Sequence, residues 1–300
     1  MSMSNISCPF CNGKSNLYLS QKDINRDTTE HLFHLYKCTS CGLLFISNPP
    51  KDLGPYYVQD YHALPQNKEN LNLALKSQQP KLEILKQYKS SGDLLEIGSS
   101  VGYFSALAKD AGFNVTAIEY DRFCVDFMKS NFGINAIQSQ DPSAIMSKMD
   151  QQFDAICLWH SIEHIKDPWI TLEACAKLLK SNGVLLIAAP NPNSRQALLM
   201  GKYWPHHDLP RHLYGLPMDW LEKLMKKAGL TVALKTTTDP ESIYWNRFSW
   251  AMISKSFVKS APARVQNGFW RLGLFVGKFF SLWEDKADHG SCYVMIFKKV

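Results

Sequence analysis

Short apolar runs alternate with segments of helical character from Asp93 onward, and this alternation limits the possible fold more than any other feature of the sequence. The first two runs are residues 94–97 and 115–118, and each is followed by a helix-like segment. Further runs lie at 135–137, 153–158, 184–188, 230–236 and 292–297. Strands that alternate with helices form a parallel sheet covered on both faces. The sequence therefore predicts an α/β fold for this part of the chain.

The segment Leu95–Gly102 connects the first predicted strand to the first predicted helix. Its glycines let the backbone come close to a ligand, and a helix N-terminus presents N–H groups that lack intrahelical partners. Ligands of open α/β sheets bind at the carboxyl ends of the strands. We therefore predict a binding loop that includes Glu96, Gly98, Ser99 and Gly102. A tight turn between strand and helix, without a ligand, is the alternative.

Two residues at the end of the second predicted strand extend this site. Glu119 ends that strand, where a carboxylate can accept hydrogen bonds from both hydroxyls of a ribose. Tyr120 follows and can pack on an adenine ring. Both residues therefore favour a ligand with an adenosine group.

The loop differs from a dinucleotide-binding loop in two respects. The dinucleotide pattern GxGxxG admits a pyrophosphate, but Ser100 occupies the second glycine position here. Glu96 adds a carboxylate where it would repel a pyrophosphate. A ligand that carries a sulfonium and an ammonium group is positive and suits an acidic loop. A nicotinamide-dependent oxidoreductase therefore ranks below an enzyme that uses a sulfonium cofactor.

Two further blocks follow in order along the chain. Residues Phe153–Ile156 and Ile162–Pro168 surround the end of the fourth predicted strand, and Leu178–Asn191 surrounds the fifth. Together with the loop, Glu119 and two N-terminal CxxC pairs, Cys8 with Cys11 and Cys38 with Cys41, these blocks resemble the class I S-adenosylmethionine-dependent methyltransferases, in the branch that carries an N-terminal zinc ribbon.

This resemblance implies a fold, a cofactor and several site residues. The fold would be a Rossmann-like sheet of seven mostly parallel strands with an antiparallel last strand, and the methyl donor would be S-adenosylmethionine. Ser139 or Gln140 would lie near the adenine, and Trp159 and His160 near the transferring methyl group. Ser100 departs from the family pattern, because a glycine is usual at that position.

Four cysteines near the N-terminus form two CxxC pairs, Cys8 with Cys11 and Cys38 with Cys41. Four thiolates satisfy a tetrahedral zinc ion and leave no open position, so we expect a structural zinc without a catalytic role. A redox pair is the alternative, although two CxxC pairs exceed what a redox motif needs. Zinc ribbons also occur in nucleic-acid-binding proteins, but the segment between the pairs is not strongly basic. A nucleic-acid partner is therefore not expected.

Three regions follow from these features. Residues 1–48 are predicted to form the zinc ribbon, 49–92 a connector with an N-terminal helix, and 93–300 the methyltransferase domain. The helix of the connector is predicted to start near Asn67 and to be kinked or interrupted at Pro80.

Three histidines are candidates for the general base that an oxygen or carbon acceptor requires. His160 directly follows the fourth predicted strand, and His164 lies just beyond it. His212 lies between the fifth strand and the next helix, where Asp208 is close enough in sequence to orient it. We rank His212 first, then His160, then His164. A structural role is the alternative for each.

A segment at about 239–290 separates the last two predicted strands and is predicted to be a helical insertion. Within it, residues 243–286 carry seven basic against two acidic side chains, which is most of the excess of the 33 basic over the 27 acidic residues of the chain. Arg264, Arg271 and Lys278 fall roughly on one helical stripe, and bulky apolar residues cover much of the rest. A basic stripe beside apolar residues suits a membrane interface. The alternative is a lid that packs on the catalytic domain and closes the acceptor pocket.

The leading functional hypothesis is methyl transfer to a small molecule, a sugar or a lipid-linked glycan. The alternatives are an RNA methyltransferase and a non-catalytic protein that binds S-adenosylmethionine or interacts through its zinc ribbon. No signal peptide or membrane-spanning run is recognisable in the sequence. We therefore expect a cytoplasmic protein, with peripheral membrane contact through the insertion as the alternative.

Overall fold

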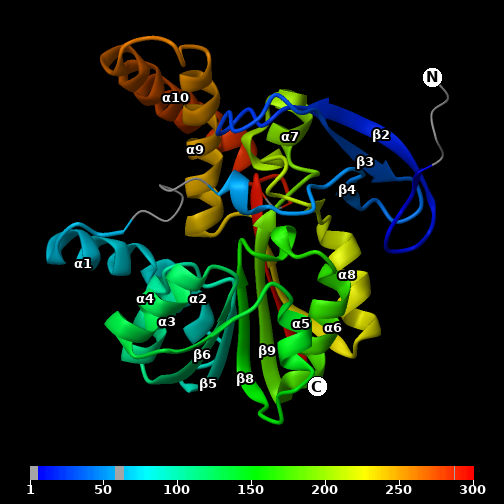
Figure 1. The fold of residues 1–300 in the computed structure, drawn as a ribbon, viewed down its shortest axis with the longest axis vertical. Helices are drawn as coiled ribbons and strands as arrows, with labels where there is room; N and C mark the ends of the chain where they lie inside the picture. Colours follow the sequence, from blue (N-terminus) through cyan, green and yellow to red (C-terminus); the bar gives the residue numbers. More distant parts are fainter. Residues whose placement is uncertain (1–5, 58–63, 287) are drawn as a thin grey trace. The chain divides into compact units, whose positions relative to one another are not determined.

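The computed structural model describes residues 6–57, 64–286 and 288–300 (Figure 1). By their contacts these residues divide into two units, each assembled from segments that are distant in sequence. Unit 1 holds the described residues of 1–57, 190–221 and 236–294, and unit 2 holds those of 58–189, 222–235 and 295–300. Residues 58–63, which belong to the predicted connector, lie outside the described residues.

The larger sheet has seven strands in the order β11–β12–β9–β8–β5–β6–β7. Their bounds are β5 Gly92–Ile97, β6 Phe113–Glu119, β7 Asn135–Gln138, β8 Phe153–Trp159, β9 Leu179–Pro190, β11 Leu230–Thr236 and β12 Cys292–Lys299. The five strands from β9 to β7 run parallel, and the C-terminal strands are antiparallel. The predicted fold class is confirmed.

The order of the strands places a switch point beside β5. The chain runs outward from β5 to β6 and β7, and then returns to β8 on the other side of β5. Ligands of such sheets bind beyond the carboxyl ends of the strands at the point where the order reverses. Leu94 and Leu95 of β5 are fully buried, as expected for a strand with helices on both faces.

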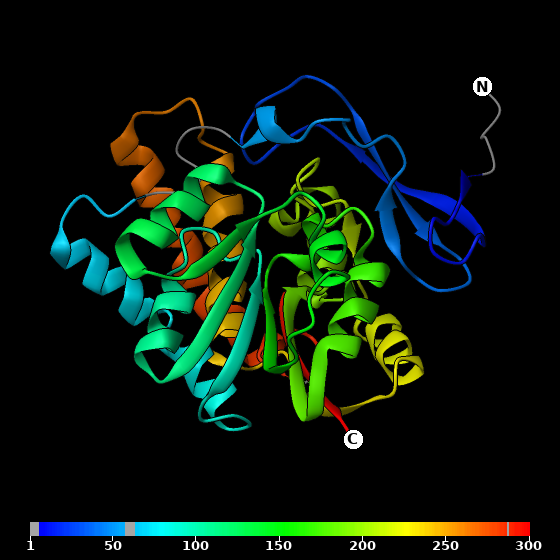
Figure 2. The same cartoon turned by 60° about the horizontal axis from the view of Figure 1, so that its bottom comes forward.

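Helices cover both faces of this sheet (Figure 2). Their bounds are α3 Tyr103–Asp110, α4 Arg122–Phe132, α5 Pro142–Met146, α6 Pro168–Leu178 and α8 Met218–Lys227. Upstream, α1 spans Lys68–Ser77 and α2 spans Gln79–Lys86. Asn67 caps α1 by accepting a hydrogen bond from the N–H of Asn70, and Pro80 lies in the first turn of α2. The helix therefore starts at the predicted residue and is interrupted beside the predicted proline.

The smaller sheet has five strands in the order β1–β2–β3–β4–β10. Their bounds are β1 Ile6–Ser7, β2 Lys14–Gln21, β3 Phe33–Cys38, β4 Leu44–Ile46 and β10 Tyr214–Gly215. Strand β10 comes from a distant part of the chain and pairs antiparallel with β4, with Tyr214 opposite Phe45. The sequence did not predict this fifth strand.

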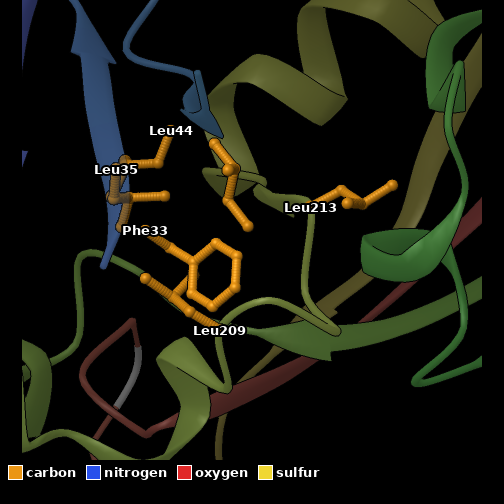
Figure 3. Packing of buried hydrophobic residues seen from close by; sticks show 6 residues of the cluster. Phe33, Leu35, Leu44, Leu209 and Leu213 are labelled. Atoms are coloured by element: carbon orange, nitrogen blue, oxygen red, sulfur yellow. The ribbon is translucent and has the colours of Figure 1, made fainter. Parts of the chain in front are cut away.

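A shared hydrophobic cluster joins the N-terminal strands to the loop before β10. Phe33, Leu35 and Leu44 from the strands pack with Leu209 and Leu213 from the loop (Figure 3). Each of these side chains is less than a tenth exposed. The ribbon therefore shares one core with residues 209–213.

The predicted C-terminal insertion forms two long helices, α9 Pro240–Ser256 and α10 Ala263–Glu284. Before it come α7 Arg195–Met200 and two short 3-10 turns, η3 Gly201–Tyr203 and η4 Pro205–His207. Within the ranges that the structure describes, every helix falls short of the length and apolar character needed to cross a bilayer.

Candidate active site and metal centre

The loop after β5 alternates between ordinary and left-handed backbone. Gly98, Ser100 and Gly102 have φ angles of 74°, 52° and 79°. Glycine adopts such angles easily, whereas a residue with a Cβ atom does so at a cost of about 1 kcal/mol or more. Ser100 therefore takes the conformation of the glycine that it replaces in the predicted pattern.

Glu119 closes this loop from the end of β6. Its Oε2 accepts a hydrogen bond from the N–H of Ser100 at 2.7 Å, and its Oε1 accepts one from the N–H of Asp121 at 3.0 Å. Burial raises the pKa of Glu119, and these N–H groups counteract part of that rise. The carboxylate is thereby fixed in position, and each oxygen keeps a lone pair for a further donor.

The neighbouring predicted residues lie around the same strand ends. The Oγ atom of Ser99 is buried and has no hydrogen-bond partner among residues 6–57, 64–286 and 288–300. Tyr120 is 40% exposed. Ser139 directly follows β7, and its N–H donates to the carbonyl of Glu119 at 2.8 Å. The buried Ser99 hydroxyl is suited to bind a polar group of a ligand, because a buried hydroxyl without a hydrogen bond destabilises the protein.

Glu96 lies inside the sheet rather than at the surface of the loop. Its side chain is almost fully buried and accepts a hydrogen bond from the hydroxyl of Ser105 in α3. Burial raises the pKa of Glu96 to about 7, although Ser105 and Lys81 favour its charged form. At neutral pH this carboxyl therefore exchanges easily between its neutral and charged forms, and a nearby cation would favour the charged form.

Trp159 is the last residue of β8, and His160 directly follows that strand. Trp159 is 6% exposed, and its ring lies under the Lys81 ammonium at 5.3 Å. His160 has a φ of 50°, and its N–H donates to the carbonyl of Ala188 at 2.9 Å. Burial, followed by the charges of Lys81 and His164, lowers the pKa of His160 to about 3. His160 is therefore neutral at physiological pH.

Glu163 and His164 lie in a short 3-10 turn, η2 Ile162–His164, immediately after β8. The Nδ1 atom of His160 is 3.8 Å from the Oε1 atom of Glu163, which is fully buried. Before that turn, the hydroxyl of Ser161 donates to the carbonyl of Ile97 at 2.6 Å. The structure thus connects the block after β8 to the end of β5 within unit 2.

Lys81, Ser105 and Ser161 were missed by the sequence reasoning. Each contacts a predicted residue or the loop itself, but none stands in a recognisable motif. Ser105 follows Glu96 by nine positions and lies in the first turn of α3. That spacing is the only signal in the sequence that could have indicated it.

In unit 1, the loop that carries His212 is organised around a buried arginine. The Arg211 guanidinium has no exposed area and binds Asp23 and Asp208, with closest distances of 2.7 and 2.8 Å from Nη2. It also donates to the carbonyl of Tyr56 at 3.1 Å. Asn25 donates to Asp208 as well, at 2.5 Å. Although burial opposes it, Arg211 holds the pKa values of both aspartates below their usual range.

His212 takes its orientation from a carbonyl rather than from Asp208. Its Nδ1 lies 2.8 Å from the carbonyl oxygen of His206, so Nδ1 must carry the proton and Nε2 the lone pair. Asp208 Oδ2 is 3.9 Å from Nε2 and is mainly engaged by Arg211. Burial lowers the pKa of His212 to about 4, although Asp208 opposes this shift. The neutral form available at pH 7 is the one that can accept a proton.

Two more histidines line a pocket with His212. His206 donates from Nε2 to the Ser249 hydroxyl at 2.8 Å, because that hydroxyl gives its own proton to the carbonyl of Trp245. His207 donates from Nε2 to the carbonyl of Gly201 at 3.1 Å, and burial lowers its pKa to about 4. Other residues lining the pocket include Leu35 and Leu44 of the ribbon, Trp204 and Tyr214. The N-terminal strands therefore form part of the wall of this histidine pocket.

The four cysteines form a compact cluster with the geometry of a metal site. All four sulfur atoms lie within 4.8 Å of one another. Cys8 Sγ is 3.7 Å from Cys41 Sγ, and Cys11 Sγ is 3.5 Å from Cys38 Sγ. Tetrahedral zinc with Zn–S bonds of about 2.3 Å separates its sulfurs by about 3.8 Å. The donor set and the spacing both fit such an ion.

One cysteine of the cluster is prepared for the thiolate form. Burial alone would raise the pKa of Cys38, but the N–H groups of Cys41 and Ser40 and the adjacent thiols lower it to about 6. Both N–H groups point at its sulfur from 3.4 Å. Thiolates are the form in which cysteines bind metal.

Comparisons with known proteins agree with this geometry. A family model described as a methyltransferase domain matches residues 69–235. A Mycobacterium tuberculosis protein described as a probable S-adenosylmethionine-dependent methyltransferase is 28% identical over 138 residues, which are 46% of this chain and 48% of that protein. A ubiquinone biosynthesis O-methyltransferase of Cereibacter sphaeroides is 29% identical over 107 residues, 34% of this chain and 41% of that protein. The chain thus spans about half, or less, of the length of these relatives.

The fold has a counterpart among solved structures. The crystal structure of an S-adenosylmethionine-dependent methyltransferase from Archaeoglobus fulgidus superposes on this chain with a TM-score of 0.52 and 16% identity. The superposition covers 76% of this chain and 94% of the other. A likeness at this identity indicates a common fold.

Proposed function

The chain belongs to the S-adenosylmethionine-dependent methyltransferases, since the matched family domain covers more than half of it, and on this basis we propose that it methylates a small-molecule, sugar or lipid-linked glycan acceptor. The observation that carries the proposal is the fixed Glu119 carboxylate at the end of β6, beside a loop of left-handed residues. When bound, S-adenosylmethionine supplies an electrophilic methyl group.

We assign donor binding to residues at the carboxyl ends of β5, β6, β7 and β8. Glu119 accepts hydrogen bonds from the ribose hydroxyls, through the lone pairs that the N–H groups of Ser100 and Asp121 leave available. Ser99 offers its buried hydroxyl, and Glu96 offers negative charge to the cationic part of the donor. The other proposed contacts are Gly98 and Gly102 of the loop, Tyr120 and Ser139 for the adenine, and Trp159 near the methyl group.

The proposed general base is a histidine, with His212 first, then His160, then His164. The protonated Nδ1 of His212 leaves Nε2 as its proton acceptor. Its pKa of about 4 keeps this nitrogen unprotonated at pH 7, but also makes it a weaker base than an unperturbed histidine. A bound acceptor that places an acidic hydroxyl or a carbanion precursor beside Nε2 would compensate for this weakness.

The residues around the histidine pocket, with the ribbon as one wall, are proposed to form part of the acceptor site. Leu35 and Leu44 lie on strands that adjoin the cysteine cluster, so zinc held by the four cysteines would fix the wall as well as the ribbon. Four thiolates would complete the tetrahedral coordination of the zinc ion, so no open position would remain for catalysis. We retain 1–48, 49–92 and 93–300 as the proposed functional regions, although the histidine pocket draws on the first and the third.

Methyl transfer from tritiated S-adenosylmethionine into a fractionated cell extract tests the activity and the acceptor class together. Label in the lipid, glycan or small-metabolite fraction supports the proposal, and label confined to RNA would favour the RNA alternative. His212→Asn and His160→Asn then test the base, once the acceptor is known. Near-normal turnover in both variants would remove His212 and His160 as the base, and near-normal turnover in His164→Asn as well would remove the histidine assignment.

A further inference from the structure

Helix α10 has two opposite apolar faces, and only one of them is covered by α9. On the covered face, a Cβ atom added to Gly273 would meet the backbone of Trp250 and Ala251 at 2.4–2.8 Å. Phe280 stacks on Trp250 with ring centroids 4.7 Å apart. These contacts bring the two helix backbones close together and fix which side of α10 faces α9.

The other face of α10, which we call the outer face, carries Leu272, Phe275, Phe279 and Leu282. Their spacing of three and four residues places them on one stripe. Their side chains are 51%, 69%, 74% and 85% exposed. Contiguous exposed apolar side chains of this size mark an interaction site, whereas scattered single ones do not.

The residues of α10 that border the outer face are basic. Arg264, Arg271 and Lys278 recur every seven residues beside the stripe, and all three are exposed. The one acidic residue of α10, Glu284, is fully buried, accepting hydrogen bonds from Trp250 at 2.8 Å and Gln196 at 3.0 Å. Among the residues of α10, the outer face therefore presents apolar groups flanked by basic side chains.

We propose that the outer face of α10 docks on an anionic lipid membrane, with its apolar stripe in the headgroup region and its basic residues against lipid phosphates. Helices with this combination bind in the plane of the interface. A second copy of the chain fits less well, because α10 offers no exposed acidic side chain to pair with the basic residues of the other copy. None of these residues belongs to the proposed methyl-transfer site, so membrane docking can be tested independently of the proposed function.

Sedimentation with vesicles tests the docking, using phosphatidylcholine alone and an equimolar mixture with phosphatidylglycerol. We expect the full chain to bind the mixed vesicles at low salt, and to bind neutral vesicles much more weakly. Neutralising Arg271→Gln with Lys278→Gln should weaken binding roughly 25-fold, since each basic residue near an anionic surface contributes roughly fivefold. Phe275→Ser with Phe279→Ser should weaken it by roughly tenfold or more.

Matched controls come from exposed residues elsewhere. Leu73 of α1 is 60% exposed and Lys223 of α8 is exposed, so Leu73→Ser and Lys223→Gln should leave vesicle binding unchanged. A salt titration of the unsubstituted protein gives a second measurement, in which binding to mixed vesicles falls as salt rises.

Three results would overturn the proposal. The first is absence of binding to mixed vesicles at low salt. The second is equal binding by the unsubstituted protein and both double variants. The third is a concentration-dependent dimer in analytical ultracentrifugation that Phe275→Ser with Phe279→Ser abolishes, without vesicle binding, since a second copy would then occupy the outer face.

Discussion

The loop after β5 and the loop that carries His212 serve the two halves of the proposed reaction, and they are stabilised by contacts of different range. The first is closed by Glu119, only 19 positions from its partner Ser100. The second is held by Arg211, whose partner Asp23 is 188 positions away. The proposed methyl-donor site is therefore held by residues that are close in sequence, whereas the proposed acceptor site depends on the N-terminal ribbon. Perturbing the ribbon should therefore affect the acceptor site and leave the methyl-donor site intact.

Loss of the proposed zinc ion should have the largest effect. Structural zinc supplies about 10 kcal/mol or more to the folding of small domains, so Cys38→Ser, or chelation, should remove a contribution of this size if the four cysteines bind it. We expect residues 6–46 to lose protection in hydrogen exchange, together with the loop at 209–213 that shares their core. Calorimetric affinity for S-adenosylmethionine should persist. Loss of donor binding along with the ribbon would contradict the separation.

Arg211→Met comes next, because it leaves the fully buried Asp23 and the mostly buried Asp208 without their cation. Removing one partner of a buried ion pair costs about 3–5 kcal/mol. The free energy of unfolding in denaturant measures this loss. Arg122→Met is the control, since the Arg122–Asp126 pair is 71% and 53% exposed and such pairs contribute about 1 kcal/mol at most. Equal losses in the two variants would refute the role given to Arg211.

The two sides should respond to pH in opposite directions. Burial raises the pKa of Glu96 from 4.5 to about 7, so the folded state holds this proton more tightly than the unfolded state. Its contribution to stability is therefore present at low pH and is lost as pH rises from 4.5 through 7, by up to about 3 kcal/mol. Glu96→Gln should flatten the stability profile in this range.

His207 and His212 should act in the opposite sense. Burial lowers both pKa values from 6.5 to about 4, so their contribution to stability is lost as pH falls through that interval. His207→Asn should reduce the acid sensitivity without affecting the profile that Glu96 produces. Thermal melts from pH 4 to pH 8 check both variants, and a profile unchanged by either substitution would contradict these assignments.

Ser100→Gly should have the smallest effect. It relieves a left-handed serine, and the more flexible unfolded chain offsets part of the gain, so we expect a stabilisation of up to about 1 kcal/mol. The N–H that binds Glu119 is retained, so donor affinity should not fall. Asn182→Gly, at a φ of 62° outside the loop, is the control, and a large loss of affinity in Ser100→Gly alone would show that the serine hydroxyl binds the donor.

The same contrast in range explains what the sequence could predict. The seven strands, the break beside Pro80 and the cysteine cluster followed from periodicity, proline chemistry and ligand spacing, all of which act over short distances. Strand β10 is two residues long and pairs with β4 more than 160 positions away, so no local pattern marks it. At the site, Asp208 shows what proximity in sequence does not reveal. Its position suggested that it orients His212, but its two carboxylate oxygens accept hydrogen bonds from Arg211.

The central claim is that Glu119 and the loop after β5 bind S-adenosylmethionine. Isothermal calorimetry on the full chain and on Glu119→Gln, with Asp126→Asn as a surface control, tests it most directly. The account predicts measurable binding that Glu119→Gln weakens by about 1–3 kcal/mol, no effect of Asp126→Asn, and no binding of NAD. Equal affinity of the full chain and Glu119→Gln, or binding of NAD in place of S-adenosylmethionine, would contradict it.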